Sequence, residues 1–271
     1  MKAPSSNLSR QGGSTLIELL VTMAILTLIL TLAVQVAESA RMAIKLTESQ
    51  SSNDATARLI FDRISRDLSQ ILIREDARIE LKSKPGNDAF AFLTQAKGFT
   101  TAGAAGERNV SLVSYSLVHN ASVGEQLLRG SCGHLCNDAA SDALTLDASL
   151  PFPAISANNL QTLSNQLLRL EIEYLIEETS GVSVAVTPPA TSESLRGLII
   201  TLVTLDDQGR RVLKPSIQTT VAANFPDASP GTNTLKTWSL KRDEMARSGI
   251  PGLPKAVFQS LRCYQRTFLI P

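Results

Sequence analysis

The sequence predicts an α+β protein in which one long N-terminal helix packs on an antiparallel β-sheet domain. An apolar run of 19 residues at 19–37 carries no charge. The stretch 14–84 holds neither Gly nor Pro, and a long segment without breakers favours a helix. After Pro85, short alternating or β-branched segments are separated by turn clusters, which is typical of antiparallel strands.

Composition places the chain among folded proteins with one apolar segment. Hydrophobic residues make up 43%, charged residues 19%, and the formal net charge is +1. A nucleic-acid partner would call for a strongly basic balance or stripe, so we expect none. About 200 residues follow the apolar run, enough for one sizeable core or two small ones.

The apolar run has the length of a membrane-spanning helix. At about 1.5 Å per residue, Leu19–Ala37 roughly matches the ~30 Å hydrocarbon core of a bilayer. Lys2 and Arg10 precede it, so the positive-inside rule places the N-terminus in the cytoplasm and the later residues in the periplasm or outside. A cleaved secretory signal fits less well, because its apolar core is shorter and the best small-x-small site, Ala37–Ser39, contains Glu38.

Glu18 is the one carboxylate near the front of this uncharged segment. It can be an interfacial residue in the first helical turn, where the helix dipole favours negative charge. Alternatively, a cut after Gly13 would free an α-amine on Ser14, four residues before Glu18. That amine would neutralise Glu18 of the same chain or of a neighbour as helices pack side by side, which meets the need of a membrane carboxylate for a partner.

Gly13, the following Ser-Thr-Leu-Ile-Glu and the apolar run closely resemble the type III leader of type IV pilins and type II secretion pseudopilins. That family's pattern is Gly, the cut, Phe-Thr-Leu-Ile-Glu and an apolar helix; here Ser14 stands where Phe is usual. The resemblance implies that a prepilin peptidase cleaves after Gly13 and methylates Ser14, and that Glu18 aids assembly with the N-terminus of an adjacent subunit. It implies as partners the peptidase, other subunits, an inner-membrane assembly platform and membrane lipid.

We therefore expect a cleaved leader at 1–13, a transmembrane helix at 14–37, a periplasmic extension of that helix at 38–75 and a β-rich pilin-like domain at 76–271. The apolar residues Phe61, Ile64, Leu68 and Ile71 recur at helical spacing and predict an apolar stripe facing that domain, with the helix continuing to about Arg74. The polar stretch Gln50–Asp54 is the weak point, where Asn53 or Asp54 could cap a second helix.

The rest of the chain reads as strands, loops and one helix. We expect strands at 77–82, 89–93, 110–118, 127–129, 167–175, 198–205 and 261–269, loops at 98–106, 181–194 and 224–231, and a helix at 234–247. In the strand at 167–175 one face would carry Leu168, Leu170, Ile172 and Tyr174, and the other the solvated Glu171 and Glu173. Asp206–Gly209 is expected to form a turn leading into 210–213, because two carboxylates fall far short of a calcium shell.

Cys132-Gly-His134-Leu-Cys136 invites a metal interpretation, but a structural zinc site needs four ligands and the other candidates, His119 and Cys263, are distant in sequence. A Cys132–Cys136 disulfide is the favoured alternative in an oxidising compartment, leaving Cys263 single or paired with one of them. We predict no catalytic, cofactor-binding or metal-binding residues.

The size of the globular part and the segment Phe61–Gln70 resemble the large minor pseudopilins of the J type. Short patches at Asp62–Leu68, Gly86–Asp88, Val110–Tyr115 and Tyr264–Arg266 are similar to the Verru_Chthon cassette pilin-like proteins. The resemblance implies a structural subunit of a pilus or secretion pseudopilus rather than an enzyme. The alternative is a membrane-tethered periplasmic binding or adhesion module that uses the helix only as an anchor.

Overall fold

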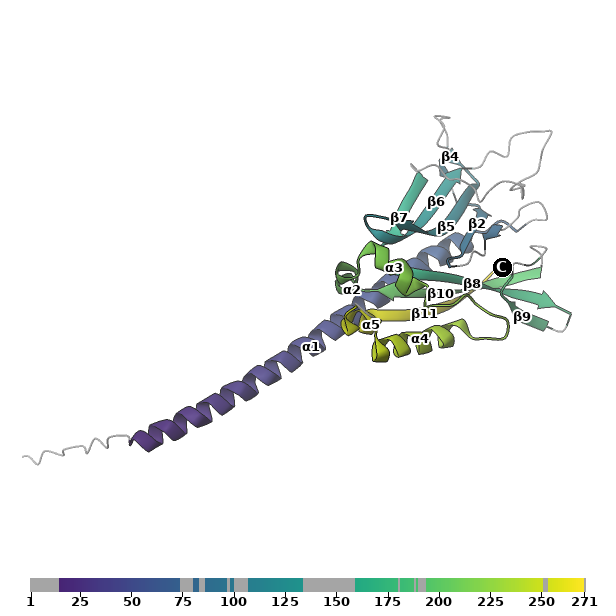
Figure 1. Cartoon of the computed structure of the whole chain (residues 1–271). Coiled ribbons are helices and arrows are strands. Elements are labelled where there is room, and N and C mark those ends of the chain that lie inside the picture. The colour runs from purple at the N-terminus through teal and green to yellow at the C-terminus, as the bar shows by residue number, and fades with distance from the viewer. Residues whose placement is uncertain are drawn as a thin grey trace, which may run out of the picture. The chain divides into compact units, whose positions relative to one another are not determined.

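The computed structural model describes residues 15–73, 80–82, 86–96, 98–99, 107–133, 159–179, 181–187, 189, 194–250 and 253–270. The chain divides into two compact units, Met1–Glu48 and Ser49–Pro271. Helix α1, Leu16–Leu68, begins in the first unit and ends in the second (Figure 1).

The helix α1 is continuous through the polar stretch Gln50–Asp54. Asn53 is fully buried there, and its side-chain amide donates to the backbone carbonyl of Ser260 at 2.9 Å. The Asn53 side chain therefore bonds across the domain instead of capping a second helix, so the expected weak point does not interrupt α1.

The helix ends at Leu68, earlier than the predicted Arg74. Ser69 and Gln70 form a turn, Ile71 makes an isolated antiparallel bridge with Thr94, and the Leu72 N–H donates to the Leu93 carbonyl at 2.8 Å. Pairing with a strand thus replaces the last predicted helical turn.

A five-stranded antiparallel sheet, called sheet 1, has the order β1-β2-β5-β6-β7. Its strands are β1 (Glu80–Lys82), β2 (Ala89–Thr94), β5 (Ser111–Asn120), β6 (Gly124–Gly133) and β7 (Leu160–Ser164). A separate ribbon pairs β3 (Gly98–Phe99) with β4 (Glu107–Arg108).

A four-stranded antiparallel sheet, called sheet 2, has the order β11-β10-β8-β9. Its strands are β8 (Leu167–Glu178), β9 (Gly181–Ala185), β10 (Leu195–Leu205) and β11 (Leu261–Leu269). The predicted α+β class with antiparallel pairing is confirmed, and β8, β10 and β11 lie where the strand patterns placed them.

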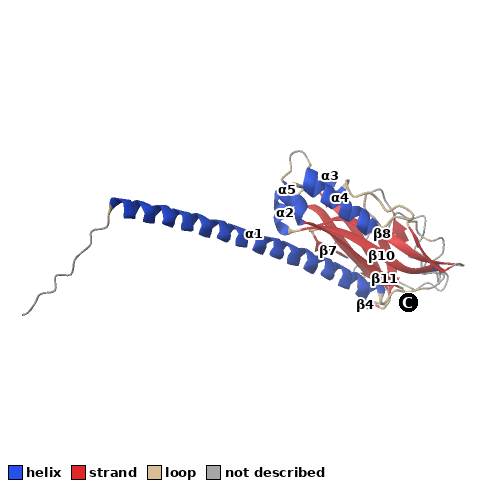
Figure 2. Cartoon of the chain, turned by 90° about the horizontal axis from the view of Figure 1, so that it is seen from below, coloured by secondary structure: helices blue, strands red, loops and turns tan. Residues whose placement is uncertain are grey.

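The described residues of the second unit also form the helices α2 (Asp207–Val212), α3 (Pro215–Ala222), α4 (Thr234–Ser248) and α5 (Lys255–Ser260). Figure 2 shows α3 and α4 on one face of sheet 2 and the last part of α1 on the other. Two apolar cores correspond to these faces. The first joins Ile60, Ile64 and Leu68 of α1 to both sheets, and the second gathers around Trp238, Phe258 and Leu261.

Several local predictions are wrong. The segment 181–185 is strand β9 rather than loop, and 207–212 is helix α2 rather than a turn leading into an extended segment. Asp206 caps α2 by accepting from the Gly209 N–H at 2.6 Å, so the aspartate pair starts a helix. Strand β6 is longer than the predicted strand at 127–129. Strands β3 and β4 pair with each other on either side of the expected loop at 98–106. Helices α3 and α5 were not predicted from the sequence.

The face assignment of β8 is wrong in two respects. The register between β8 and β10 shifts between Val203 and Thr204, and this bulge turns Leu168 to the second core while Leu170, Ile172 and Tyr174 face the first. Glu171 and Glu173 are each 4% exposed instead of solvated. Their face is buried because the C-terminal helices and the loop before α4 pack on sheet 2.

Candidate functional site

The N-terminal turn of α1 places Glu18 three residues after Thr15. The Thr15 hydroxyl accepts from the Glu18 backbone N–H at 3.4 Å, and the Thr15 carbonyl accepts from the Leu19 N–H at 3.2 Å. This Thr-x-x-Glu spacing is that of a capping box, which starts a helix at this point. Glu18 consequently lies in the first turn, where the positive end of the helix dipole stabilises a carboxylate.

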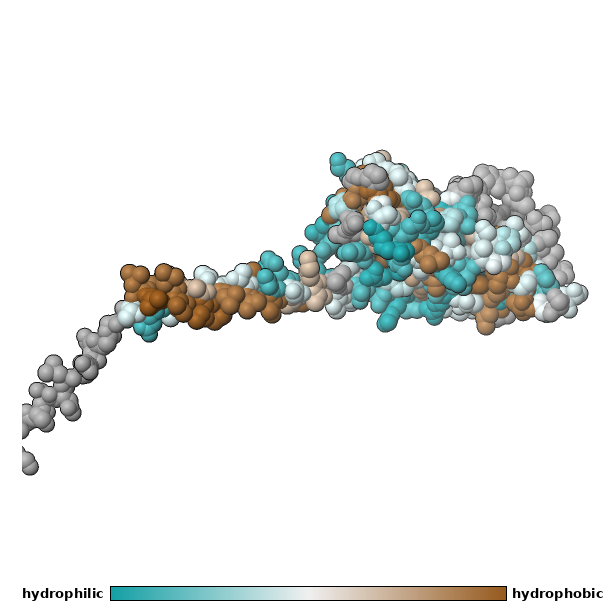
Figure 3. Space-filling model, turned by 60° about the horizontal axis from the view of Figure 1, so that its bottom comes forward, coloured by the Kyte–Doolittle hydropathy of each residue, from teal (hydrophilic) through white to brown (hydrophobic). Residues whose placement is uncertain are grey.

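The first part of α1 exposes its apolar side chains. Between Leu16 and Val36, the exposed Leu, Ile and Val side chains each have 51–83% of their surface accessible (Figure 3). An 18-residue window of α1 has a mean hydropathy of 2.5, long and apolar enough to cross a membrane. So large an uncovered apolar surface requires lipid or other helices to cover it.

Threonine hydroxyls in this segment are satisfied within the helix. Thr22 donates to the Leu19 carbonyl at 2.9 Å, Thr27 to the Met23 carbonyl at 3.0 Å, and Thr31 to the Thr27 carbonyl. Internal bonding of this kind is what a polar group needs in a hydrocarbon environment, so these threonines are compatible with a membrane span.

Of the residues predicted for processing and assembly, the structure describes Glu18, while Gly13 and Ser14 lie outside the described residues. Cys136 and His134 also lie outside them. Cys132 on β6 and Cys263 on β11 are half-buried and form no disulfide with another described residue. The predicted Cys132–Cys136 disulfide therefore stays a prediction. Within the described residues, no group of three or more His, Cys, Asp or Glu side chains is arranged to hold a metal ion.

The C-terminal end of α1 is bound to sheet 1 by a buried charge pair. Arg129 on β6 donates from Nε to Asp67 Oδ2 at 2.6 Å and from Nη2 to Asp67 Oδ1 at 3.0 Å. Tyr115 on β5 donates its hydroxyl to Asp67 as well. All three side chains are buried, and burial together with the Asp67 carboxylate raises the pKa of Tyr115.

Two further polar contacts hold α1 to strand β11. Tyr264 donates to Asp54, and Arg266 Nη1 donates to Asp62 Oδ1 at 2.9 Å, while the Arg266 guanidinium lies 5.4 Å from the centre of the Phe268 ring. Each of the patches at 62–68, 110–115 and 264–266 thus contributes a polar contact between α1 and one of the two sheets.

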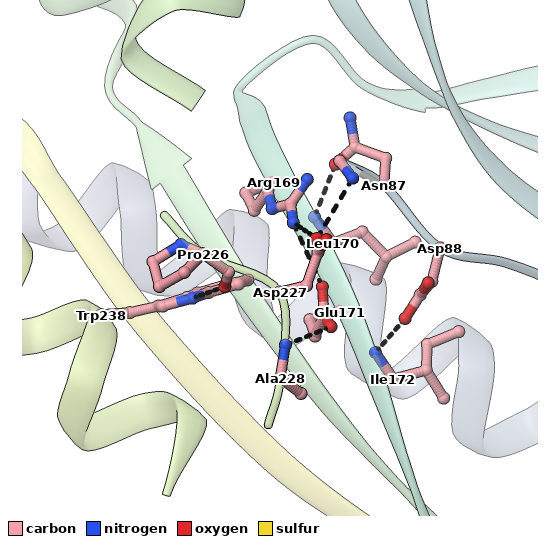
Figure 4. A network of polar contacts seen from close by, with 11 residues as sticks. Asn87, Asp88, Arg169, Leu170, Glu171, Ile172, Pro226, Asp227, Ala228 and Trp238 are labelled. Atoms are coloured by element: carbon pink, nitrogen blue, oxygen red, sulfur yellow. Dashed lines mark hydrogen bonds and ion pairs between the residues drawn. The ribbon is translucent and has the colours of Figure 1, made fainter. Parts of the chain in front are cut away.

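The patch Gly86–Asp88 forms part of a separate polar network with β8 and the loop before α4 (Figure 4). The Asp88 carboxylate accepts from the Ile172 N–H at 2.8 Å, and the Asn87 side-chain oxygen accepts from the Leu170 N–H at 3.1 Å. Arg169 lies between Glu171 and Asp227 as their common cationic partner.

The amino-acid sequence from residue 8 to residue 34 matches the model of the prokaryotic N-terminal methylation motif. The match confirms the predicted prepilin-type leader, and with it the resemblance to the type IV pilin and pseudopilin superfamily in this part of the chain. The apolar helix that follows this leader indicates membrane anchoring.

Among solved structures, the chain is similar to a type IV-like pilin from Thermus thermophilus. The two share 12% sequence identity over 80% of this chain and 94% of that chain, with a TM-score of 0.34. No curated protein matches the sequence significantly.

Sequence reasoning found the N-terminal residues but missed the buried polar ones. Asp67, Arg129 and Tyr115 come from three distant segments, and single charges on a helix or strand normally face solvent. The available signal was the arginine inside each β segment: Arg129 and Arg169 both sit among leucines, where an unpaired guanidinium would be costly.

Proposed function

We propose that this chain is a minor pilin-like or pseudopilin-like structural subunit that is processed by a prepilin peptidase and assembled into a type IV pilus or a type II secretion pseudopilus. The methylation motif over residues 8–34 is the observation that carries this proposal. In it, the peptidase cuts between Gly13 and Ser14 and methylates the new amine of Ser14.

The proposed location is the inner membrane, crossed once by Leu19–Ala37 with the N-terminus in the cytoplasm and the C-terminal domain in the periplasm. The exposed apolar side chains of α1 support a membrane location, and Lys2 and Arg10 support the orientation. After assembly, the subunit would lie in a periplasmic or extracellular filament.

Assembly would proceed by lateral packing of α1 helices supplied through an inner-membrane assembly platform. When α1 moves from lipid to a position among neighbouring helices, its Glu18 carboxylate would pair with the freed α-amine of an adjacent subunit. An unpaired carboxylate costs about 2.5–3.5 kcal/mol at the bilayer centre and less near the end of the helix, where Glu18 lies, and the pair would offset this cost. A subunit of this kind acts by assembling with other subunits and lipid, and its activity requires no catalytic residue or cofactor.

Within this class, we propose that the chain is a large minor pseudopilin of the J type, because the size of its domain and the segment Phe61–Gln70 resemble that type. The proposed division is a leader at 1–13, a membrane span at 14–37, a periplasmic helix at 38–75 and a globular domain at 76–271. The charge pair of Asp67 with Arg129 would fix the periplasmic helix to that domain.

The assembly role can be tested by replacing Glu18 with Ala in cells that carry a peptidase and an assembly platform. Glu38→Ala, at the other end of the apolar run, is the matched control. We expect Glu18→Ala chains to be made and inserted but lost from the sheared filament or cross-linked pseudopilus fraction, whereas Glu38→Ala chains assemble. Normal assembly of Glu18→Ala would instead favour the tethered module, which needs the helix only as an anchor.

A further inference from the structure

A groove opens on the second unit where α1, the end of β7 and helix α2 come together (Figure 2). Thr56 and Leu59 line it from α1, residues 162–166 from β7 and the turn after it, and Asp207 and Arg210 from α2. Its volume of about 280 Å³ is close to the lower end of the range of about 300–1,000 Å³ for small-molecule pockets. The groove therefore suits a ligand the size of one ring.

Arg210 brings to this groove a guanidinium with unused hydrogen-bonding capacity. Its Nε atom is buried and donates to no oxygen of a described residue. The Asp207 Oδ1 atom lies 3.6 Å from that nitrogen, beyond hydrogen-bond distance, and the Asp207 side chain is 57% exposed. Such a solvent-exposed pair on one helical turn is weak, so Arg210 remains available to a stronger acceptor.

A carboxylate is the acceptor that suits this guanidinium best. The planar fork of an arginine matches the two oxygens of a carboxylate, and the bonds are charge-assisted. A buried N–H donor without an acceptor is also unfavourable, so a ligand that supplies an oxygen to Arg210 Nε gains from the pairing. This side of the groove therefore selects for an anionic oxygen group.

The turn after β7 supplies neutral polar groups opposite Arg210. Gln166 is fixed there, because its side-chain oxygen accepts from the Thr56 hydroxyl and its backbone N–H donates to Ser164 Oγ at 3.0 Å. The side-chain nitrogen of Gln166 and the side-chain amide of Asn165 bond to no other residue in the described part of the chain. Both amides are therefore free to bond to ligand hydroxyl groups.

Leu59 and Leu163 add apolar surface to the same groove. Leu59 is 56% exposed, and Leu163 packs against the first core, which fixes its position. Amide and carboxylate groups beside a small apolar surface match a sugar ring, whose edge carries hydroxyl groups and whose faces carry C–H groups.

We propose that this groove, called the Arg210 groove, binds one ring of an acidic saccharide. Arg210 would bind the sugar carboxylate, while Asn165, Gln166 and Asp207 bond to the hydroxyl groups. A neutral sugar would leave Arg210 without an anionic acceptor, and a simple carboxylate would leave the amides unused. Both are expected to bind more weakly than a sugar acid.

The test uses the full chain in nonionic detergent micelles, in a buffer free of carboxylates. The probes are D-glucuronate and D-galacturonate, with D-glucose as the uncharged control and acetate as the control without a ring. Saturation-transfer NMR titrations should show that the better of the two sugar acids binds roughly tenfold or more tightly than either control. In ¹H–¹⁵N spectra of the arginine side chains, that sugar acid should shift the Arg210 Nε–H signal.

Arg210→Gln should weaken binding of the sugar acid by roughly tenfold or more. Arg211→Gln is the matched control, because it removes the same charge from the next, exposed residue, which does not line the groove. Its affinity should stay within about twofold of the wild type. Asn165→Ala should weaken binding of the sugar acid and leave that of acetate unchanged.

The proposal is overturned if neither sugar acid binds, if acetate binds as tightly as the better sugar acid, or if Arg211→Gln loses as much affinity as Arg210→Gln. If Arg210→Gln does not fold, the wild-type Arg210 Nε–H signal decides: a shift on adding the sugar acid supports the proposal, and no shift refutes it. The inference does not rest on the proposed function, since no readout depends on cleavage, membrane orientation or filament assembly.

Discussion

Arg129 and Asp67 form a buried bidentate pair that joins a strand of sheet 1 to the last turn of α1. The two N–H···O distances are 2.6 and 3.0 Å, and both side chains are less than a tenth exposed. Parallel guanidinium–carboxylate bonds are strong and geometrically specific. The pair therefore sets the position of the end of α1 on the domain, in addition to the apolar contacts of Ile60, Ile64 and Leu68.

Replacing Asp67 with Ala should destabilise the domain by about 3–5 kcal/mol, because Arg129 would be left buried without its counter-charge. Asp62→Ala is the matched control on the same helix, since Asp62 is exposed and its bond to Arg266 should contribute less than about 1 kcal/mol. Denaturant unfolding of the full chain in detergent, followed by circular dichroism, measures both. Equal decreases in the free energy of unfolding of the two variants would show that the Asp67–Arg129 pair stabilises the domain no more than an exposed ion pair does.

The apolar contact of α1 with the two sheets can be tested with adjacent residues. Ile60 is fully buried and Leu59 is 56% exposed. We expect Ile60→Ala to lower the free energy of unfolding by about 2–5 kcal/mol through loss of packing and cavity formation. Leu59→Ala should change it by less than about 0.5 kcal/mol. If Leu59→Ala were the more damaging change, the assigned face of α1 would be wrong.

The free energy of unfolding of the domain should decrease as the pH rises, because Glu171 loses its proton. Its pKa is about 7 in the folded chain and near 4.5 in the unfolded chain, so the folded state binds more protons between these values. The stabilising contribution is complete below about pH 4.5 and is lost as the pH rises through about 7, at most roughly 3 kcal/mol. Unfolding free energies measured across this range should fall less steeply in Glu171→Gln than in the wild type, and identical slopes would contradict the assignment.

Cys263 should be a slowly reacting thiol. Burial in the core beside α4 raises the pKa of the Cys263 thiol to about 11, although the nearby Arg242 and the Ser239 hydroxyl oppose the rise. Because the thiolate is the reactive form, alkylation near pH 8 should be roughly 100-fold slower than in the denatured chain. Timed alkylation with peptide mass mapping measures this rate. A native rate close to the denatured one would mean that β11 does not bury this side chain.

Regular apolar patterns allowed much of the fold to be predicted from the sequence. The long helix, the strands around Leu170, Leu202 and Tyr264, and the helix that holds Trp238 all carry a clear helical or strand periodicity. Cys263 and Tyr264 are neighbours on the predicted strand at 261–269, and they pack on the second and first core respectively, as the alternation of a strand requires.

The errors arise where distant segments change the local preference. Alternation along β8 correctly separated Leu170 from Glu171, but whether the polar face is solvated depends on a loop and helices much later in the chain. The bulge that turns Leu168 is likewise set by pairing with β10. Helix α3 contains Thr219, Thr220 and Val221, whose β-branching weakens a helical signal, and Pro215 at its start was the remaining cue.

The N-terminal site follows from local sequence, because leader, cut and first helical turn are contiguous. Glu18 was expected in the first helical turn and lies there; the cap that Thr15 provides to that turn was not predicted, although the Thr-x-x-Glu spacing is a local signal for it. The buried contacts of Asp67 and Glu171 required the tertiary structure, since their partners are separated by many residues in sequence.

The most direct test of the proposed function is the N-terminus of the membrane-extracted chain, determined by intact mass and N-terminal peptide analysis with and without a co-expressed prepilin peptidase. Gly13→Val, which places a branched side chain at the proposed cleavage junction, is the control. We predict a chain that begins at Ser14 and carries a methyl group when active peptidase is present, and an uncut chain in its absence or in Gly13→Val. An uncut wild-type chain beside active peptidase, or one that begins near Arg41 as after signal-peptide cleavage, would contradict the assignment.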